Sequence, residues 1–279
     1  MIVLPRGKRA GKACDPMKTI PQAVLLSALI MVIATAEALA FTCDASYRFP
    51  FSKKIAGKSI EFGYSGQSGP GHWGSLAPDN KWGMCETGYR QAPIALSQHG
   101  AVAAGVSIEF HYNQDIHFVD HSDDLSADHG AGNYIVIDGI RYELLQMHFH
   151  QPSESILNGK TYPLELHLVH RSQAGVLAVV GVFIVKGRPD RGVIQLPQDP
   201  RQESEAVLIQ PAALLPENRS FMRYNGSLTT PGCDQPVMFN MMDHPVQMSA
   251  EQIAAFSCGI ANSARPLQKL NSRFVLYGK

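Results

Sequence analysis

Three histidines on two neighbouring stretches of the chain could together bind a metal ion. His148 and His150 lie in residues 142–154, and His167 lies in residues 164–170. Both stretches alternate in a way that predicts β-strands, and side chains two residues apart on a strand share a face. If the two strands present these faces on one side of a sheet, three imidazoles converge. Three neutral imidazoles with an open fourth position are the ligand set of a catalytic zinc site.

The alternative is a structural role, because a buried histidine is more often a hydrogen-bonded core residue than a ligand. Gln146 and Glu165 favour the metal interpretation, since each precedes a histidine by two residues and shares its face. Ligating histidines usually donate their second N–H to a carboxylate, a carbonyl or an amide. A strand without a metal has no reason to place these groups there.

Several segments resemble the α-class carbonic anhydrases. The zinc-binding core of that family is similar to Gln146-Met-His-Phe-His150, Pro152-Ser-Glu154 and Glu165-Leu-His-Leu-Val-His170. Other family motifs occur in family order, namely Tyr64-Ser-Gly, Gly69-Pro-Gly-His-Trp73-Gly, Gln91-Ala-Pro-Ile94 and Tyr224-Asn-Gly-Ser-Leu-Thr-Thr-Pro231. The resemblance covers about residues 60–279. It implies reversible hydration of CO2 to bicarbonate and a proton, by attack of zinc-bound hydroxide.

The resemblance also implies roles for individual residues. It makes His148, His150 and His167 the zinc ligands, with Gln146 and Glu165 as partners of His148 and His167. Thr229 would accept a hydrogen bond from the hydroxide and donate one to Glu154. The substrate pocket would be lined by Val169, Val179, Leu228, Thr230 and Phe239. Sulfonamide and anion inhibitors are expected to bind.

The chain departs from the family pattern at a few positions. Ser155 stands where a histidine is usual, Phe239 where a tryptophan is usual, and Ala92 where a serine is usual. The position of the proton-shuttle histidine falls on Asp123. A carboxylate of pKa near 3.9 accepts a proton uphill from a group of pKa about 7, so Asp123 is a poor relay. The alternatives are His117, His121 and His129.

The pattern of the chain itself predicts a mainly β (α+β) fold. Alternating stretches are frequent, whereas one short helix, residues 249–256, carries a capping box with Ser249 and Gln252. Residues 62–96, rich in glycine, proline and aromatics, read as an ordered but irregular segment. The family resemblance implies a single domain around a large twisted, mixed, mostly antiparallel sheet of about ten strands, with short peripheral helices.

Residues 1–40 have the pattern of a secretory signal peptide. A basic lead precedes an apolar run at residues 23–33, and Ala38-Leu39-Ala40 offers a cleavage site. Met17 could be the true start. A membrane anchor is the alternative, but the run is shorter than the roughly 18–20 residues that a span needs. We therefore predict a mature domain at residues 41–279, periplasmic or secreted, with no stable membrane anchor.

Charge and cysteine content narrow the possible functions. The chain has 24 basic and 24 acidic residues, which gives no basic field for nucleic acid. An even number of cysteines follows the leader, which suggests disulfides with three possible connectivities. These cysteines are Cys43, Cys85, Cys233 and Cys258. A cysteine zinc site is disfavoured because no Cys-x-x-Cys occurs. The family resemblance selects Cys85–Cys233 and leaves a Cys43–Cys258 pair open.

Two other functions remain open from the sequence. A catalytically weak relative could bind zinc or another ligand without turnover, although inactive relatives usually lose a zinc ligand. A different zinc hydrolase would use a general base beside the metal, and Glu154 could serve as that base.

Overall fold

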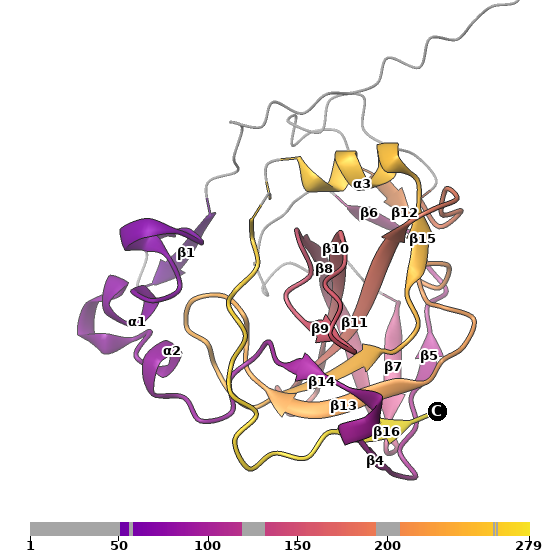
Figure 1. Cartoon of the computed structure of the whole chain (residues 1–279), viewed down its shortest axis with the longest axis horizontal. Helices are drawn as coiled ribbons and strands as arrows, with labels where there is room; N and C mark the ends of the chain where they lie inside the picture. The colour runs from indigo at the N-terminus through magenta and orange to yellow at the C-terminus, as the bar shows by residue number, and fades with distance from the viewer. Residues whose placement is uncertain (1–50, 56–57, 119–131, 194–206, 259, 261) are drawn as a thin grey trace, which may run out of the picture. The chain divides into compact units, whose positions relative to one another are not determined.

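A large mixed β-sheet carries both histidine stretches (Figure 1). The computed structural model describes residues 51–55, 58–118, 132–193, 207–258, 260 and 262–279. Within these residues the sheet has ten strands in the order β4-β16-β13-β14-β11-β10-β8-β7-β5, with β15 paired to β11 outside this path. The prediction of a mixed sheet of about ten strands is confirmed.

The strands of this sheet are β4 (Val102–Ala103), β5 (Glu109–His111), β7 (Tyr134–Ile137), β8 (Ile140–His150), β10 (Leu164–Ser172), β11 (Leu177–Lys186), β13 (Phe221–Gly226), β14 (Val237–Met242), β15 (Val246–Met248) and β16 (Leu276–Gly278). Separate two-stranded ladders are formed by β1 (Phe51–Ile55) with β2 (Lys58–Phe62), β3 (Ala95–Leu96) with β9 (Ile156–Leu157), and β6 (Ile116–Phe118) with β12 (Val207–Ile209). The helical elements are η1 (Gly66–Ser68), α1 (Trp73–Leu76), η2 (Pro78–Asn80), α2 (Met84–Thr87), η3 (Gln98–Gly100) and α3 (Ala250–Ser257).

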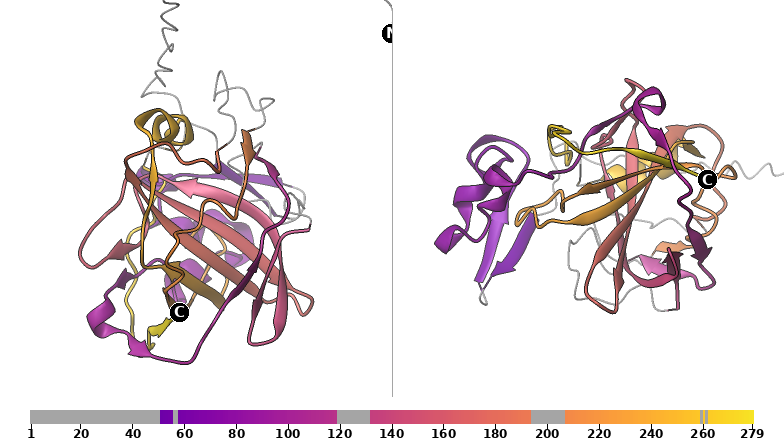
Figure 2. Two further views of the ribbon diagram at one scale, coloured as in Figure 1. Left: turned by 90° about the vertical axis from the view of Figure 1, so that its right-hand side faces the viewer. Right: turned by 90° about the horizontal axis from the view of Figure 1, so that it is seen from below.

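Most neighbouring strands of the large sheet run antiparallel. The parallel pairs among the described strands are β11 with β14, β11 with β15, and β16 with β4. Strands β8, β10 and β11 lie side by side at the centre of the sheet. Figure 2 shows the sheet from two further sides. Because they are central, their backbone hydrogen bonds are made on both edges, and this fixes the register of any side chain that they carry.

The central strands have two different buried faces. On one face, Leu166 and Leu168 of β10 pack with Met147 of β8 and Val180 of β11 in the largest apolar cluster. The other face of β10 carries Glu165, His167 and Val169. Alternation along each strand therefore separates an apolar core from a face with polar groups, as the period of two predicts.

Two tight turns lie next to the central strands. Asp138 and Gly139 join β7 to β8 with φ of 51° and 76°, the left-handed conformation that a two-residue hairpin turn requires. Asn158 and Gly159 follow β9 with φ of 49° and 77°. Both were recognisable as Asx-Gly pairs, because these residue types tolerate positive φ.

The predicted helix is present as α3 at the top of Figure 1. Ser249 accepts from the backbone N–H of Gln252, and the Gln252 side chain accepts from the Ser249 N–H, which completes the capping box. The segment 62–96 is irregular as expected, but it also contains the short helices α1 and α2.

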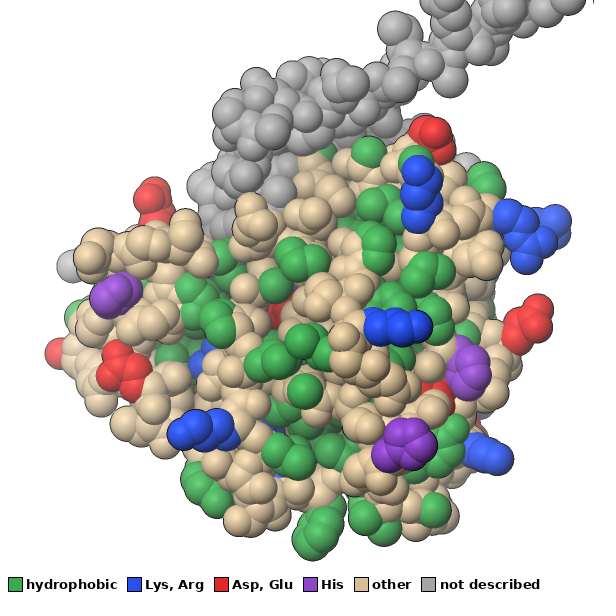
Figure 3. Space-filling model, viewed as in Figure 1, with side chains coloured by type: hydrophobic (Ala, Val, Ile, Leu, Met, Phe, Trp, Pro, Cys, Tyr) green, Lys and Arg blue, Asp and Glu red, His purple; other side chains and the backbone are tan. Residues whose placement is uncertain are grey.

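All described residues belong to one compact unit, residues 39–279. The predicted signal peptide at residues 1–40 lies outside the described residues, so its boundary stays a prediction. No helix among the described residues is long and apolar enough to cross a membrane. On the face shown in Figure 3, lysine and arginine side chains are scattered singly among uncharged ones.

Candidate metal centre

Strands β8 and β10 bring the three histidines together. In their antiparallel register His148 is opposite His167. All three side chains are buried, and one nitrogen of each lies within 4.8 Å of the others. On the other side of β10, Gly181 is opposite His167. A Cβ at Gly181 would overlap the Met241 side chain and would lie in ordinary contact, 3.7 Å, with Cδ2 of His167, so the glycine makes room for Met241.

Each histidine points its remaining ring nitrogen at an oxygen that can only accept a hydrogen bond. The pairs are His148 Nδ1 with Gln146 Oε1 at 2.8 Å, His150 Nδ1 with the backbone oxygen of Ser263 at 2.8 Å, and His167 Nε2 with Glu165 Oε1 at 2.7 Å. Each of these nitrogens therefore carries the ring proton. The lone pairs that remain belong to Nε2 of His148 and His150 and to Nδ1 of His167.

The geometry of these lone pairs fits a metal ion. Nε2 of His148 and Nε2 of His150 are 3.0 Å apart. With both ring protons on Nδ1, neither Nε2 can donate to the other, so two lone pairs face each other at close range. A cation between them removes that repulsion, and two nitrogens bound to a tetrahedral zinc ion are about 3.3 Å apart. The three histidines thus form a ligand set of the zinc type.

Glu154 borders the centre. Its Oε2 lies 3.3 Å from Nε2 of His150, and its Oε1 accepts from the backbone N–H of Arg265 at 2.9 Å. Burial raises the pKa of Glu154 well above its usual value, and the nearby Glu165 raises it further. The Arg265 N–H and the Thr229 hydroxyl act in the opposite direction. Among the described residues, no hydrogen bond of normal geometry reaches Oε2.

An apolar wall adjoins His167. Val169 of β10 is opposite Val179 of β11, which in turn is opposite Phe239 of β14. The ring of Phe239 lies 5.7 Å from that of His167, and Leu228 packs against the same cluster. Four predicted substrate-pocket residues therefore lie in one cluster beside the centre. The fifth, Thr230, is buried in the following loop, where its backbone oxygen accepts from Cys233 N.

Glu165 is held by more groups than the sequence suggested. Its Oε1 accepts from His167 Nε2 and from the Ser155 hydroxyl at 3.1 Å, and its Oε2 accepts from the Ser155 N–H at 2.8 Å. Burial raises the pKa of Glu165 to about 7, against the effect of these hydrogen bonds. The sequence did not predict the contacts of Ser155 with Glu165 or the contact of the Arg265 N–H with Glu154, because no local pattern indicates them.

The predicted disulfide between Cys85 and Cys233 is confirmed, with a Cα–Cα distance of 5.0 Å. It ties α2 to the loop that carries Thr229 and Thr230. Cys258 is also disulfide-bonded, but Cys43 lies outside the described residues, so the Cys43–Cys258 pairing that the sequence left open stays open.

The proton-shuttle candidates are not placed by the structure. Asp123, His121 and His129 lie outside the described residues. The backbone of His117 lies on β6 opposite Leu208. These assignments stay predictions.

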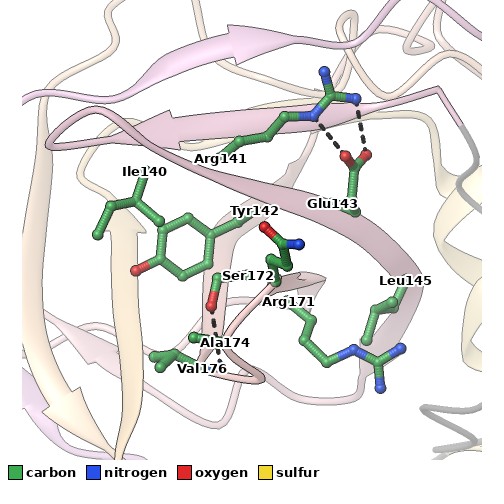
Figure 4. Close-up of a pocket in the computed structure, with 10 residues that line it drawn as sticks. Ile140, Arg141, Tyr142, Glu143, Leu145, Arg171, Ser172, Ala174 and Val176 are labelled. Carbon is green, nitrogen blue, oxygen red and sulfur yellow. Dashed lines mark hydrogen bonds and ion pairs between the residues drawn. The ribbon is translucent and has the colours of Figure 1, made fainter.

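A groove of about 1040 Å³ lies at the opposite ends of the same strands (Figure 4). Its lining includes Tyr142 and Leu145 of β8 and Ser172 of β10, and Arg141 donates two hydrogen bonds to Glu143 beside it. None of the three histidines lines this groove, so it is separate from the candidate metal centre.

Three converging histidines beside an apolar wall, on a large mixed sheet, are the arrangement expected of a zinc enzyme. Comparison with known proteins identifies the family. Residues 68–279 match the family model described as eukaryotic-type carbonic anhydrase. A protein named carbonic anhydrase from Nostoc sp. (strain PCC 7120) is 37% identical over 235 residues, which is 78% of this chain and 86% of that protein.

Solved structures agree. The α-carbonic anhydrase of Thermovibrio ammonificans, in complex with the inhibitor sulfanilamide, is 37% identical with a TM-score of 0.66, covering 80% of this chain and 100% of that one. Dioscorin complexed with ascorbate is 28% identical with a TM-score of 0.65, covering 78% and 97%. The chain belongs to the α-class carbonic anhydrase family. It is an enzyme of reversible CO2 hydration.

Proposed function

We propose that this carbonic anhydrase works with a zinc ion held by His148, His150 and His167. Bound zinc lowers the pKa of its water and so supplies a hydroxide nucleophile at neutral pH. Carbonic anhydrase is the general example of this effect of zinc. One observation carries the proposal. Nε2 of His148 and Nε2 of His150 face each other at 3.0 Å, while the acceptors at the opposite nitrogens keep both ring protons away.

Glu154 and Thr229 orient the nucleophile. An ionised carboxylate only accepts hydrogen bonds, so the Thr229 hydroxyl, which lowers the pKa of Glu154 by hydrogen bonding, would donate its proton to that carboxylate. The lone pairs of the Thr229 oxygen are then available to the O–H of the nucleophile. Burial opposes the ionised form of Glu154, and the N–H of Arg265 on Oε1 supports it.

The apolar wall receives CO2. Val169, Val179, Phe239 and Leu228 offer carbon atoms and no hydrogen bond, which suits a substrate without charge or donor groups. Thr230, next to Thr229, would contact the bicarbonate product. The wall and the histidines meet at His167 and Phe239, so CO2 bound on the wall would lie beside the proposed metal site.

Metal analysis combined with stopped-flow CO2 hydration tests this proposal. His150→Ala or His167→Ala should remove stoichiometric zinc and abolish activity, because two remaining ligands do not hold a catalytic ion. His170→Gln is the matched control. His170 is a buried histidine of the same strand, but it contacts Tyr112 and the backbone oxygen of Ala178 instead of the centre. Full zinc occupancy in either ligand variant would overturn the assignment.

The same assay separates the alternatives. Zinc binding without CO2 hydration would indicate a ligand-binding relative, and dioscorin shows that a protein of this fold can be found with a quite different molecule. Ester hydrolysis without CO2 hydration would indicate another zinc hydrolase. Inhibition by sulfanilamide, which is bound in the related structure, is expected here, as is inhibition by simple anions.

Proton release should limit turnover. With Asp123 at the shuttle position, we expect kcat to rise strongly with the concentration of an imidazole-type buffer, while kcat/KM barely changes. Asp123→His should raise kcat and weaken the buffer dependence. A high, buffer-independent kcat in the wild type would mean that another group relays the proton, and His117→Ala, His121→Ala and His129→Ala would then identify it.

We also propose that the protein is exported to the periplasm or the medium. It is supported by the leader pattern of residues 1–40 and by the Cys85–Cys233 disulfide, which persists in oxidising compartments. Sequencing the N-terminus of the exported protein should find Phe41 first. An intact leader on the exported protein would contradict cleavage near Ala40.

A further inference from the structure

The loop between β8 and β10 directs two donors of one residue at Glu165. Ser155 is fully buried. Its backbone N–H donates to Oε2 of Glu165 at 2.8 Å, and its hydroxyl donates to Oε1 at 3.1 Å. The same Oε1 accepts from Nε2 of His167 at 2.7 Å. Ser155 therefore holds both oxygens of the carboxylate that contacts a proposed metal ligand.

We propose that Ser155 is a positioning residue of the metal centre, whose hydroxyl fixes the Glu165 carboxylate in the plane from which it orients His167. The inference rests on the proposed role of His167 as a zinc ligand. It adds a residue to the site at the position where the family resemblance expected a histidine.

The argument is geometric. The last torsion of a glutamate is broad, so the Glu165 carboxylate turns about its Cγ–Cδ bond unless its contacts prevent it. The backbone N–H of Ser155 holds Oε2, the backbone N–H of Glu154 also donates to this carboxylate, and the His167 ring contacts Oε1. Unlike the His167 contact, the Ser155 hydroxyl does not move with the imidazole, so it fixes Oε1 independently of the ring that Oε1 orients. Oε1 then stays in line with His167 Nε2, which keeps the ring proton there and presents Nδ1 to the metal.

The backbone around Ser155 is itself anchored, so its hydroxyl is aimed by the fold. The Ser153 hydroxyl donates to the backbone oxygen of Ser155 at 2.9 Å and accepts from Tyr162 N at 3.0 Å. Removing only the Ser155 hydroxyl should therefore leave the loop in place and isolate the contact with Oε1.

The test measures zinc dissociation from the zinc-loaded enzyme into an excess of chelator. Ser155→Ala should speed dissociation about tenfold, the lower end of the effect of losing a partner of a ligand, because the backbone N–H remains. Ser155→Thr keeps a hydroxyl and should restore the wild-type rate. If the extra methyl group prevents folding, Ser155→Cys serves instead, and its weaker S–H donor should give an intermediate rate.

Ser172→Ala is the matched control. Ser172 is a buried serine at the other end of β10, and its hydroxyl accepts from Val176 N and does not contact Glu165. It should lower thermal stability without changing zinc dissociation. Unchanged dissociation in Ser155→Ala, or equal acceleration in Ser172→Ala, would overturn the positioning role. A wild-type enzyme that binds no zinc would instead overturn the proposed function, and this inference with it.

Discussion

Removing the disulfide between Cys85 and Cys233 should cost a large part of the stability of this enzyme. The bond closes a loop with a sequence separation of 148 residues. In the chain-entropy model, a cross-link over such a loop restricts the unfolded chain by about 5 kcal/mol at 25 °C. Losses measured on removing native disulfides run from about 2 to 5 kcal/mol, so we expect a value in that range.

A set of three variants tests the estimate. Cys85→Ala, Cys233→Ala and the double variant should all lose nearly the same free energy of unfolding in urea, because either single change breaks the bond completely. Mutation is preferable to a reductant, since Cys258 is also disulfide-bonded and would be reduced too. Peptide mapping without reduction confirms the bond in the wild type.

The outcome that refutes the reasoning is additivity. If the double variant loses the sum of two independent single losses, each cysteine acts through its own packing and not through a shared bond. A loss below about 1 kcal/mol in all three would show that the constraint on the unfolded chain is unimportant here.

Other changes probe the apolar wall, a buried histidine and the support of Glu154. Phe239→Trp should destabilise by about 1–3 kcal/mol in thermal unfolding, because the buried Phe239 ring already stacks on Tyr224 at 5.2 Å; a higher melting temperature would contradict this. Burial lowers the pKa of His170 to about 3, below the 6.5 of an unfolded histidine, so stability should fall by up to about 4 kcal/mol as the pH drops from 6.5 to 3. His170→Gln should flatten that part of the pH–stability curve, and an unchanged curve would mean that other groups cause the loss. Arg265→Lys should lower both stability and kcat/KM, because the Arg265 side chain donates from one nitrogen to Gln91 and to a backbone oxygen, and its backbone N–H donates to Glu154. A folded variant with wild-type kcat/KM would show that the Arg265 side chain does not affect Glu154.

The parts of the site that the sequence predicted are those governed by local periodicity. A period of two places Gln146, His148 and His150 on one face of β8. It likewise places Glu165 and His167 on one face of β10. The turn residues and the capping box of α3 were likewise readable, because their conformations depend on a few neighbouring residues. The family resemblance, in contrast, supplied the roles of Thr229 and Glu154 and the pairing of two distant cysteines.

The parts that local periodicity could not predict depend on contacts distant in sequence. The partner of His150 is the backbone oxygen of Ser263, 113 residues away; the family resemblance implies a backbone carbonyl there, but no local pattern does, since any residue type could supply it. The same holds for the N–H of Arg265 on Glu154. The register shift between Val169 and His170 depends on how β8 and β10 adapt to each other, and alternation within one strand carries no sign of it.

The placement of all three proposed ligands on one ladder has a consequence for metal selection. His148, His150 and His167 stand on strands whose register is held by backbone hydrogen bonds, so the sheet itself sets the spacing of the three proposed ligands. Such a scaffold offers three nitrogen donors to any divalent ion of suitable size. The Irving–Williams series ranks Cu²⁺ above Zn²⁺ for nitrogen ligands, so selection of zinc has to come from the geometry of the site and from metal availability. Copper should therefore compete with zinc for the same three nitrogen atoms wherever it is present during folding.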